Sequence, residues 1–225
     1  QGLALPAAGR AQPAQAATIA QYRCELAGQA WQRGREAQAM AAAREALRVD
    51  PNCVRASLLC GELALANGHF AEARQEFARV IEQDMDFLPL ILPKMRECYR
   101  ALGDAATFIE FLARLQPRAQ TAAVALALAE GLREQGDMAR AEAMLRRELG
   151  QPSVSLRIVR EYLAQFVWLT IPCRGPLQPA LQALDEILRR QAVFQCRQCG
   201  FEARHLFWHC PGCHRWGCLK PIAPN

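Results

Sequence analysis

The sequence lacks the features that mark enzymes and membrane-spanning proteins. No stretch of its 225 residues approaches the roughly 18 to 20 consecutive apolar residues that cross a membrane. It contains no phosphate-binding loop, no dinucleotide-binding glycine pattern, no zinc-protease helix and no nucleophile elbow. The neighbouring carboxylates Asp84 and Asp86 fall at a predicted helix end, where capping explains them. We therefore expect a protein that is not an enzyme.

The first residues also lack the pattern of a signal peptide. They have neither a basic region nor a long apolar core, and the chain does not begin with Met. Residues 1–17 are rich in Ala, Gln, Gly and Pro without periodicity, so we expect a disordered lead-in there. The formal net charge of +5 is small and compatible with an acidic partner without requiring one. We expect this chain to be soluble.

Cysteine, by contrast, is plentiful, and its placement matters more than its number. Five of the ten cysteines are scattered through predicted helices, where small buried residues are the simplest interpretation: Cys24, Cys53, Cys60, Cys98 and Cys173. The other five crowd into residues 196–218. A secreted disulfide framework would be short and rich in loops throughout. A long helical chain with one terminal cluster indicates a reducing compartment and thiolates held by a metal.

A repeat of about 34 residues, the tetratricopeptide period, precedes this cluster. It is marked by glycines at intervals of 34, 35 and 33 residues: Gly34, Gly68, Gly103 and Gly136. Five residues after them stand Ala39, Ala73, Phe108 and Ala141, and nine after them stand Ala43, Phe77, Leu112 and Leu145. Seven residues before them stand Ala27, Gly61, Arg96 and Ala129. Small residues there let paired helices approach closely, so Arg96 marks a degenerate third repeat. An irregular helical bundle is the alternative.

These patterns predict an all-α fold, a tetratricopeptide-repeat superhelix followed by a small rubredoxin-like or zinc-ribbon metal module. About four helix pairs occupy residues 18–152. Residues 153–192 continue with helical spacing, interrupted by "IPCRGP", and we interpret them as a divergent capping helix pair. Residues 193–225 form the module.

The module is predicted from the spacing C-x2-C-x10-C-x2-C. Its thiols are Cys196, Cys199, Cys210 and Cys213. Each C-x-x-C pair forms a tight turn, and two such turns facing each other build a tetrahedral cage for Zn²⁺ or a single iron ion. A module this small cannot fold around an apolar core alone, so the metal would act as a structural staple. Two disulfides or a redox switch are the alternatives, but a redox C-x-x-C usually stands singly in a βαβ context.

Other side chains of the module have simpler interpretations. We expect the histidines His205, His209 and His214 to be surface residues or neighbours of the site rather than ligands. Cys218 is a spare thiol outside the predicted ligand set. The aromatic residues form the small core of the module or its contact with the last helices: Phe201, Phe207, Trp208 and Trp216. The basic residues outnumber Glu202: Arg189, Arg190, Arg197, Arg204, Arg215 and Lys220.

The stretch "FQCRQCGFEARHLFWHCPGCHRWGCLKPI", residues 194–222, together with the repeats before it, resembles the bacterial lipopolysaccharide assembly protein B family. The likeness covers about residues 20 to 222, and the terminal motif is its specific part. The resemblance implies a tetratricopeptide superhelix packed against a rubredoxin-type module, with Cys196, Cys199, Cys210 and Cys213 as metal ligands. It also implies a regulator of lipopolysaccharide synthesis that promotes degradation of the deacetylase LpxC by the membrane protease FtsH.

The resemblance further implies a position on the cytoplasmic face of the inner membrane, through an N-terminal anchor that this chain does not include. A second departure is Cys218, which stands where a small polar residue is expected. The leading hypothesis is a non-enzymatic adaptor with protein partners and no nucleic-acid partner. The alternatives are a nucleic-acid-binding zinc ribbon, for which "FEARHLFWH" interleaves aromatic and basic residues, and a rubredoxin-like electron carrier, which requires iron.

Overall fold

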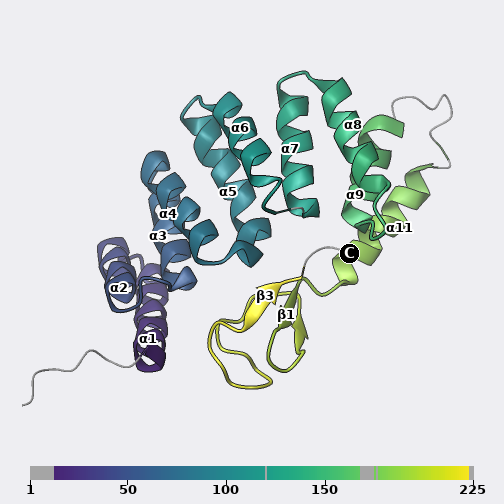
Figure 1. Ribbon diagram of the computed structural model, residues 1–225. Coiled ribbons are helices and arrows are strands. Elements are labelled where there is room, and N and C mark those ends of the chain that lie inside the picture. Colours follow the sequence, from purple (N-terminus) through teal and green to yellow (C-terminus); the bar gives the residue numbers. More distant parts are fainter. Residues whose placement is uncertain (1–12, 120, 168–174, 176, 223–225) are drawn as a thin grey trace, which may run out of the picture. The chain divides into compact units, whose positions relative to one another are not determined.

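The computed structural model describes residues 13–119, 121–167, 175 and 177–222. The chain divides into two compact units, residues 1–83 and 84–225 (Figure 1). The first unit contains α1 (Pro13–Gln32), α2 (Glu36–Val49), α3 (Val54–Ala66) and α4 (Phe70–Gln83). The helices of the second unit are η1 (Met85–Phe87), α5 (Leu88–Ala101), α6 (Ala105–Leu115), α7 (Ala122–Glu134), α8 (Met138–Leu149), α9 (Leu156–Tyr162), the π-helical turn η2 (Leu163–Val167) and α11 (Leu177–Arg190). Its strands are β1 (Phe194–Cys196), β2 (Glu202–Ala203) and β3 (Leu219–Pro221).

The repeat register predicted from the glycines is confirmed by the helix boundaries. All four repeat glycines lie in the turn inside a helix pair, and all have a left-handed φ, between 71° and 82°. A residue without Cβ adopts that conformation at little cost, which explains why glycine recurs at this position. The eight apolar positions predicted five and nine residues after these glycines are all buried.

Small residues hold the helix pairs of the first unit together. Ala27 in α1 is fully buried between its neighbours. A Cβ atom placed on Gly61 of α3 would lie only 2.6 Å from the ring of Phe77 in α4, which is itself fully buried. Close approach at these positions is therefore the reason for the small side chains.

The second unit continues with α5 and α6 and then α7 and α8, which stand side by side in Figure 1. Arg96 of α5 occupies the small-residue position of its repeat and remains half-buried, because it forms an ion pair with Glu130 of α7. Side chains cap the later helices: Thr121 accepts from the Val124 amide before α7, and Asp137 accepts from the Arg140 amide before α8.

The described helical segments after α8 are α9, η2 and α11. Ser155 caps α9, and Arg160 of α9 donates to Asp185 of α11 at 3.0 Å, which joins the two helices. Leu181 of α11 is buried, whereas Ile187 of the same helix is 46% exposed. Cys173 lies outside the described residues, as does most of the "IPCRGP" interruption.

A three-stranded antiparallel sheet of order β2-β1-β3 forms the terminal module. In the central strand β1, Phe194 pairs with Ala203 on one side and with Pro221 on the other. The buried side chains between the strands are Phe194, Cys196, Cys210, Cys218 and Leu219. This core has two large apolar side chains and three thiols, which agrees with a module that depends on its cysteines.

The predicted fold class, a tetratricopeptide array with a small metal-binding module, is confirmed. One boundary is corrected. Residues 13–17 belong to α1 rather than to a disordered lead-in, because Pro13 occupies the first helical position, where its fixed φ and missing N–H suit a helix start. Residues 1–12 lie outside the described residues. None of the helices in the described part of the chain combines the length and the apolar character needed to cross a membrane.

A candidate four-thiol metal centre

Two turns of the same geometry carry the predicted cysteines. In the first, the Gly200 amide donates to the carbonyl of Cys196 at 3.0 Å. In the second, the His214 amide donates to the carbonyl of Cys210 at 2.9 Å. Both turns end in a left-handed residue, Gly200 with φ 74° and His214 with φ 55°. Gly200 follows the second thiol and His214 follows the fourth, so the two residues occupy corresponding positions in the two turns.

The two turns bring all four predicted thiols together. Their sulfur atoms lie within 4.8 Å of one another, with 3.7 Å between Cys196 and Cys213 and 3.7 Å between Cys199 and Cys210. Four sulfurs at about 2.3 Å from a tetrahedral Zn²⁺ are separated by about 3.8 Å. The observed distances therefore fit a four-coordinate ion. Outside residues 196–218, no group of three or more His, Cys, Asp or Glu side chains among the described residues is gathered in this way.

The first thiol of each pair is favoured as a thiolate. Burial opposes ionisation of Cys196, but the amides of Cys199 and Gln198 donate to its sulfur and lower its pKa to about 6. Burial likewise opposes ionisation of Cys210, while the amides of Cys213 and Gly212 lower its pKa. Since thiolate is the form that binds metal, each turn prepares its first cysteine for coordination.

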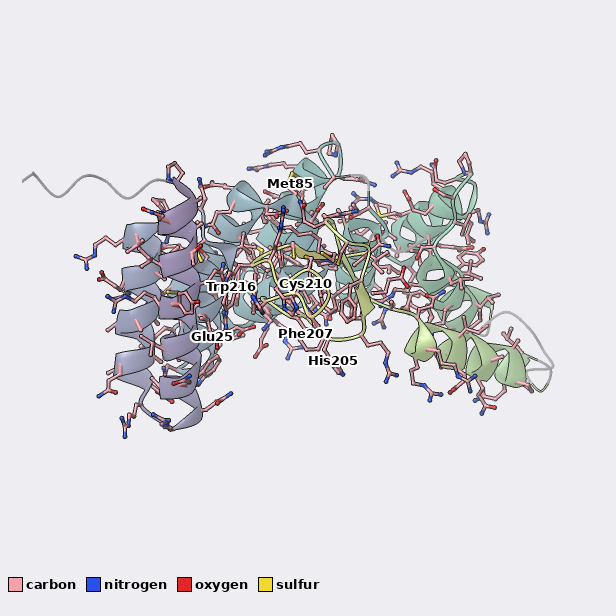
Figure 2. The ribbon with its side chains drawn as sticks, turned by 90° about the horizontal axis from the view of Figure 1, so that it is seen from below. Glu25, Met85, His205, Phe207, Cys210 and Trp216 are labelled. Carbon is pink, nitrogen blue, oxygen red and sulfur yellow. The ribbon has the colours of Figure 1, made fainter. Side chains whose placement is uncertain are left out.

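The three histidines lie outside the sulfur cluster. All are exposed, and none belongs to the group of metal-binding side chains found in the described residues. The ring of His209 contacts Trp216, with 4.7 Å between ring centroids, and lies 5.7 Å from the ring of His214. In Figure 2, Cys210 lies within the loops of the module and His205 near its rim.

A fifth thiol, Cys218, reaches the cluster. Its sulfur lies 3.4 Å from that of Cys196 and 3.9 Å from that of Cys213, and its side chain is only 8% exposed. Burial and the two neighbouring thiols raise the pKa of Cys218. Sequence reasoning treated it as a spare residue because no spacing rule includes it.

The module docks on η1 and α5. Trp208 stacks on Phe87 of η1 with 5.6 Å between ring centroids and 10° between planes. The ammonium of Lys220 lies 4.6 Å from the Phe87 ring centroid and forms an ion pair with Asp84. Leu90 of α5 packs against the module core.

This contact extends the predicted role of the two acidic residues at the helix start. Asp84 does cap η1, since its carboxylate accepts from the Asp86 amide at 3.0 Å. It also pairs with Lys220, and Asp86 pairs with Arg197 at 3.4 Å. The sequence indicated the cap but not the partners, which lie more than a hundred residues away in the chain.

Four of the six basic residues counted in and before the module form ion pairs, with three carboxylates between them. Arg189 and Arg190 both pair with Glu186. Arg197 and Lys220 pair with the acidic residues of η1 described above. The positive surface available to an anionic partner is therefore smaller than the sequence count indicates, which weakens the nucleic-acid alternative.

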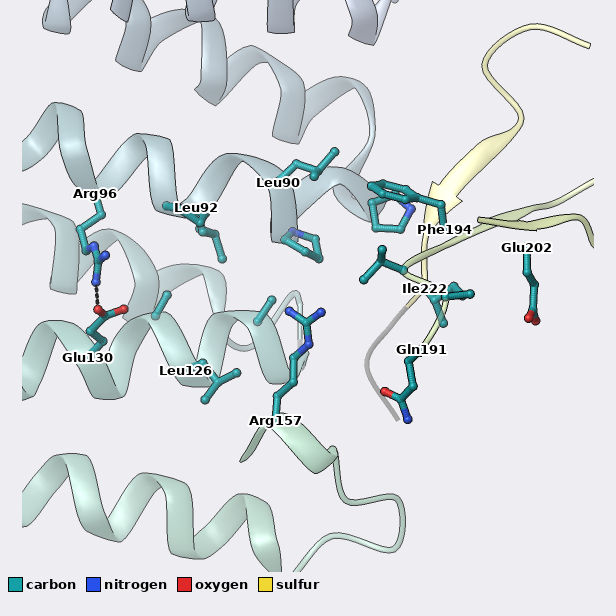
Figure 3. Close-up of a pocket in the computed structure, with 17 residues that line it drawn as sticks. Leu90, Leu92, Arg96, Leu126, Glu130, Arg157, Gln191, Phe194, Glu202 and Ile222 are labelled. Atoms are coloured by element: carbon teal, nitrogen blue, oxygen red, sulfur yellow. Dashed lines mark ion pairs between the residues drawn. The ribbon is translucent and has the colours of Figure 1, made fainter. Parts of the chain in front are cut away.

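A pocket of about 610 Å³ lies where the module meets α5 and α7 (Figure 3). Its apolar lining includes Leu90, Leu92, Leu126, Phe194 and Ile222. Arg96 reaches it from α5 but is paired with Glu130. Arg157 of α9 points from the opposite side toward α5, and its guanidinium has no ion-pair partner among the residues that the structure describes.

Comparison with known proteins finds a match for each part of the chain. Residues 194–221 match the rubredoxin metal binding domain, and residues 30–95 match the tetratricopeptide repeat. A crystal structure of the thermophilic tetratricopeptide protein TTC0263 from Thermus thermophilus aligns with 76% of this chain and 99% of that chain, at 20% identity and a TM-score of 0.43.

Lipopolysaccharide assembly protein B of Escherichia coli K12 is 30% identical over 208 residues, which are 91% of this chain and 53% of that protein. The protein of the same name from Haemophilus influenzae is 30% identical over 182 residues, 80% of this chain and 46% of that protein. The chain thus spans about half the length of these relatives. The resemblance predicted from the sequence is confirmed, and over 91% of its length this chain is homologous to lipopolysaccharide assembly protein B.

Proposed function

We propose that this protein is a non-enzymatic adaptor in lipopolysaccharide assembly, in which a metal-held module and the repeat helices together form a binding surface for a protein partner. The observation that carries the proposal is the pocket, because its walls come from both α5 and α7 on one side and β1 and β3 on the other. An intact module is then a condition for binding. The homology to lipopolysaccharide assembly proteins supports the biological role.

The ligands of the module in this proposal are Cys196, Cys199, Cys210 and Cys213, holding one Zn²⁺ or iron ion. The bound ion supplies no reaction here; it holds four thiolates together and so stabilises two turns that have little apolar core. The chain's own contacts, Phe87 against Trp208 and Asp84 with Lys220, then hold the module against α5.

The chemistry of the pocket suits a segment of polypeptide. Its apolar walls accept aliphatic or aromatic side chains, and the unpaired Arg157 offers a charge-assisted hydrogen bond to a carboxylate. Pro93 has no N–H and cannot donate to the carbonyl of Pro89, and both prolines line the pocket. We therefore propose an apolar segment with an acidic group as the occupant.

The finer proposal, which follows from the family resemblance, names the partners. The chain would bind the deacetylase LpxC and promote its degradation by the membrane protease FtsH, at the cytoplasmic face of the inner membrane. This assignment is supported by the homology to lipopolysaccharide assembly protein B.

The test is a binding titration of purified LpxC against the metal-loaded protein. Arg157→Glu and Leu126→Asp alter the pocket without touching the thiols, and each should weaken binding at least about tenfold, the loss of roughly 1.4 kcal/mol. Arg133→Glu on the exposed end of α7 is the matched charge control and should leave binding unchanged. Equal affinity of all three variants would remove the pocket from the proposal.

Removal of the metal tests the adaptor role separately. Cys210→Ser should release the ion and abolish LpxC binding, while the helical circular-dichroism signal stays largely intact. Full binding by the metal-free variant would defeat the proposal. Analysis of the metal from the native host also tests the electron-carrier alternative, since protein that contains only zinc has no redox-active centre.

A further inference from the structure

We propose that Cys218 is a reserve metal ligand, able to replace Cys213 or Cys196 when either thiolate is lost from the centre. The inference rests on the proposed metal site and adds a fifth sulfur that neither the spacing motif nor the family match assigns. It applies to this chain in particular, because Cys218 stands where a small polar residue was expected.

The placement of the sulfur is the first observation. Cys218 lies 3.4 Å from Cys196 and 3.9 Å from Cys213, as close as the ligand pairs are to each other at 3.7 Å. It does not belong to the group whose sulfurs all lie within 4.8 Å, so it is farther than that from Cys199 or Cys210. Cys218 therefore lies outside the tetrahedron, over the edge that joins Cys196 and Cys213.

The local backbone can deliver the sulfur inward without unfolding. The carbonyl of Cys218 accepts from the Arg197 amide at 2.9 Å, which anchors the start of β3 beside β1. The thiol of Cys218 donates to the carbonyl of Arg215 at 3.2 Å, and its sulfur also contacts those of Cys196 and Cys213. A rotation of the Cys218 side chain about χ1, which has three staggered positions, breaks the hydrogen bond to Arg215 and moves the sulfur.

The exposure of the proposed ligands indicates which of them a reagent can reach while Cys218 stays buried. Cys199 is exposed and Cys213 is half-exposed, whereas Cys196 is 2% and Cys218 is 8% exposed. Of the two outer ligands, Cys213 is the one that lies beside Cys218. A reagent that modifies or displaces Cys213 from outside leaves the buried pair in place. On becoming a ligand Cys218 releases its proton to solvent, as any thiol does, and the ion keeps four thiolates.

Cys218 lies beside Cys196 and Cys213, so single substitutions of the four ligands can test the inference. Co²⁺ bound to the full chain serves as the spectroscopic probe. Cys213→Ser and Cys196→Ser should retain the charge-transfer and d–d bands of a four-thiolate tetrahedral site, because Cys218 completes it. Cys199→Ser and Cys210→Ser have no such neighbour and should show a three-thiolate spectrum with weaker binding. The double variant Cys213→Ser/Cys218→Ser should lose the fourth thiolate.

Cys218→Ser alone should leave the wild-type spectrum unchanged. A Cys213→Ser spectrum identical to that of Cys210→Ser would overturn the inference. Failure of the wild type to bind Co²⁺ at all would instead defeat the proposed metal site. The two results are therefore distinguishable.

A second measurement covers the case in which the single-ligand variants do not fold. Zinc transfer from the wild-type chain to an excess of chelator proceeds through partly dissociated states, which Cys218 would recapture. Cys218→Ser should then lose zinc about tenfold faster, a size typical of residues that support a metal site from outside the ligand set. Cys60→Ser, a buried thiol of α3, is the control. Equal rates for all three proteins would contradict the reserve role.

Discussion

At the position seven residues before the turn glycine, the second repeat carries Gly61 and the third carries Arg96. Gly61 lets α3 and α4 touch through the ring of Phe77, and no side chain fits between them. Arg96 instead leaves the helix pair and reaches Glu130 in the next repeat, where it lines the pocket beside the metal module. The regular repeat is built for packing, whereas the repeat that breaks the rule carries the surface on which the module and the proposed partner meet.

Each of these repeats also has one fully buried phenylalanine. The largest effect on stability is expected at the phenylalanine that lies under the module. Phe77 lies inside its helix pair, while Phe87 lies under the module against Trp208. Phe87→Ala should cost about 3–5 kcal/mol of unfolding free energy in the metal-loaded protein, because it leaves a cavity at the docking contact. Chemical denaturation followed by tryptophan fluorescence measures it.

The control for that substitution is Phe207→Ala, which removes an aromatic side chain that is 42% exposed on the same module. Its cost should be smaller than that of Phe87→Ala, since Phe207 is already 42% exposed whereas Phe87 is fully buried. If both alanine variants lose the same stability, the docking contact is not where the module is held.

Gly61→Ala tests the close packing of α3 against α4 in the regular repeat. The added methyl group would lie 2.6 Å from a ring that cannot move into solvent, so we expect a loss of about 1–3 kcal/mol in spite of the better helix propensity of alanine. Gly28→Ala in α1 has open space around the new methyl group and should be neutral or stabilising. A stabilised Gly61→Ala protein would show that α3 and α4 adjust freely.

Some of these features can be predicted from the sequence and others cannot. The turn glycines and the paired thiols could be predicted, because a left-handed turn needs glycine and a metal cage needs its spacing. The docking contact could not, since Asp84 and Lys220 are 136 residues apart and no periodicity relates them. Arg96 looked like a defect because its partner Glu130 belongs to another repeat. Cys218 was set aside because its contacts arise only when β3 lies beside β1.

The ion pairs of the docking contact offer a smaller and graded test. The side chains of Asp84 and Lys220 are 22% and 18% exposed, whereas those of Asp86 and Arg197 are 48% and 53% exposed. A double-mutant cycle with Asp84→Asn and Lys220→Met should give a coupling free energy of about 1 kcal/mol, since the pair is shielded from solvent. The same cycle on Asp86 and Arg197 should give a coupling near zero. Equal couplings would mean that burial does not strengthen the inner pair.

The smallest expected effect on stability returns to Arg96. Arg96→Ala restores the residue type found in the first and fourth repeats, and the lost pair with Glu130 is partly exposed, so unfolding free energy should change by less than about 1 kcal/mol. Binding of LpxC should nevertheless weaken, because Glu130 is left as an unpaired negative charge in a pocket proposed to accept an acidic group. Arg100→Ala, an exposed arginine of the same helix, controls for the loss of charge. A variant that is destabilised yet binds normally would assign Arg96 to packing and remove the contrast between the two repeats.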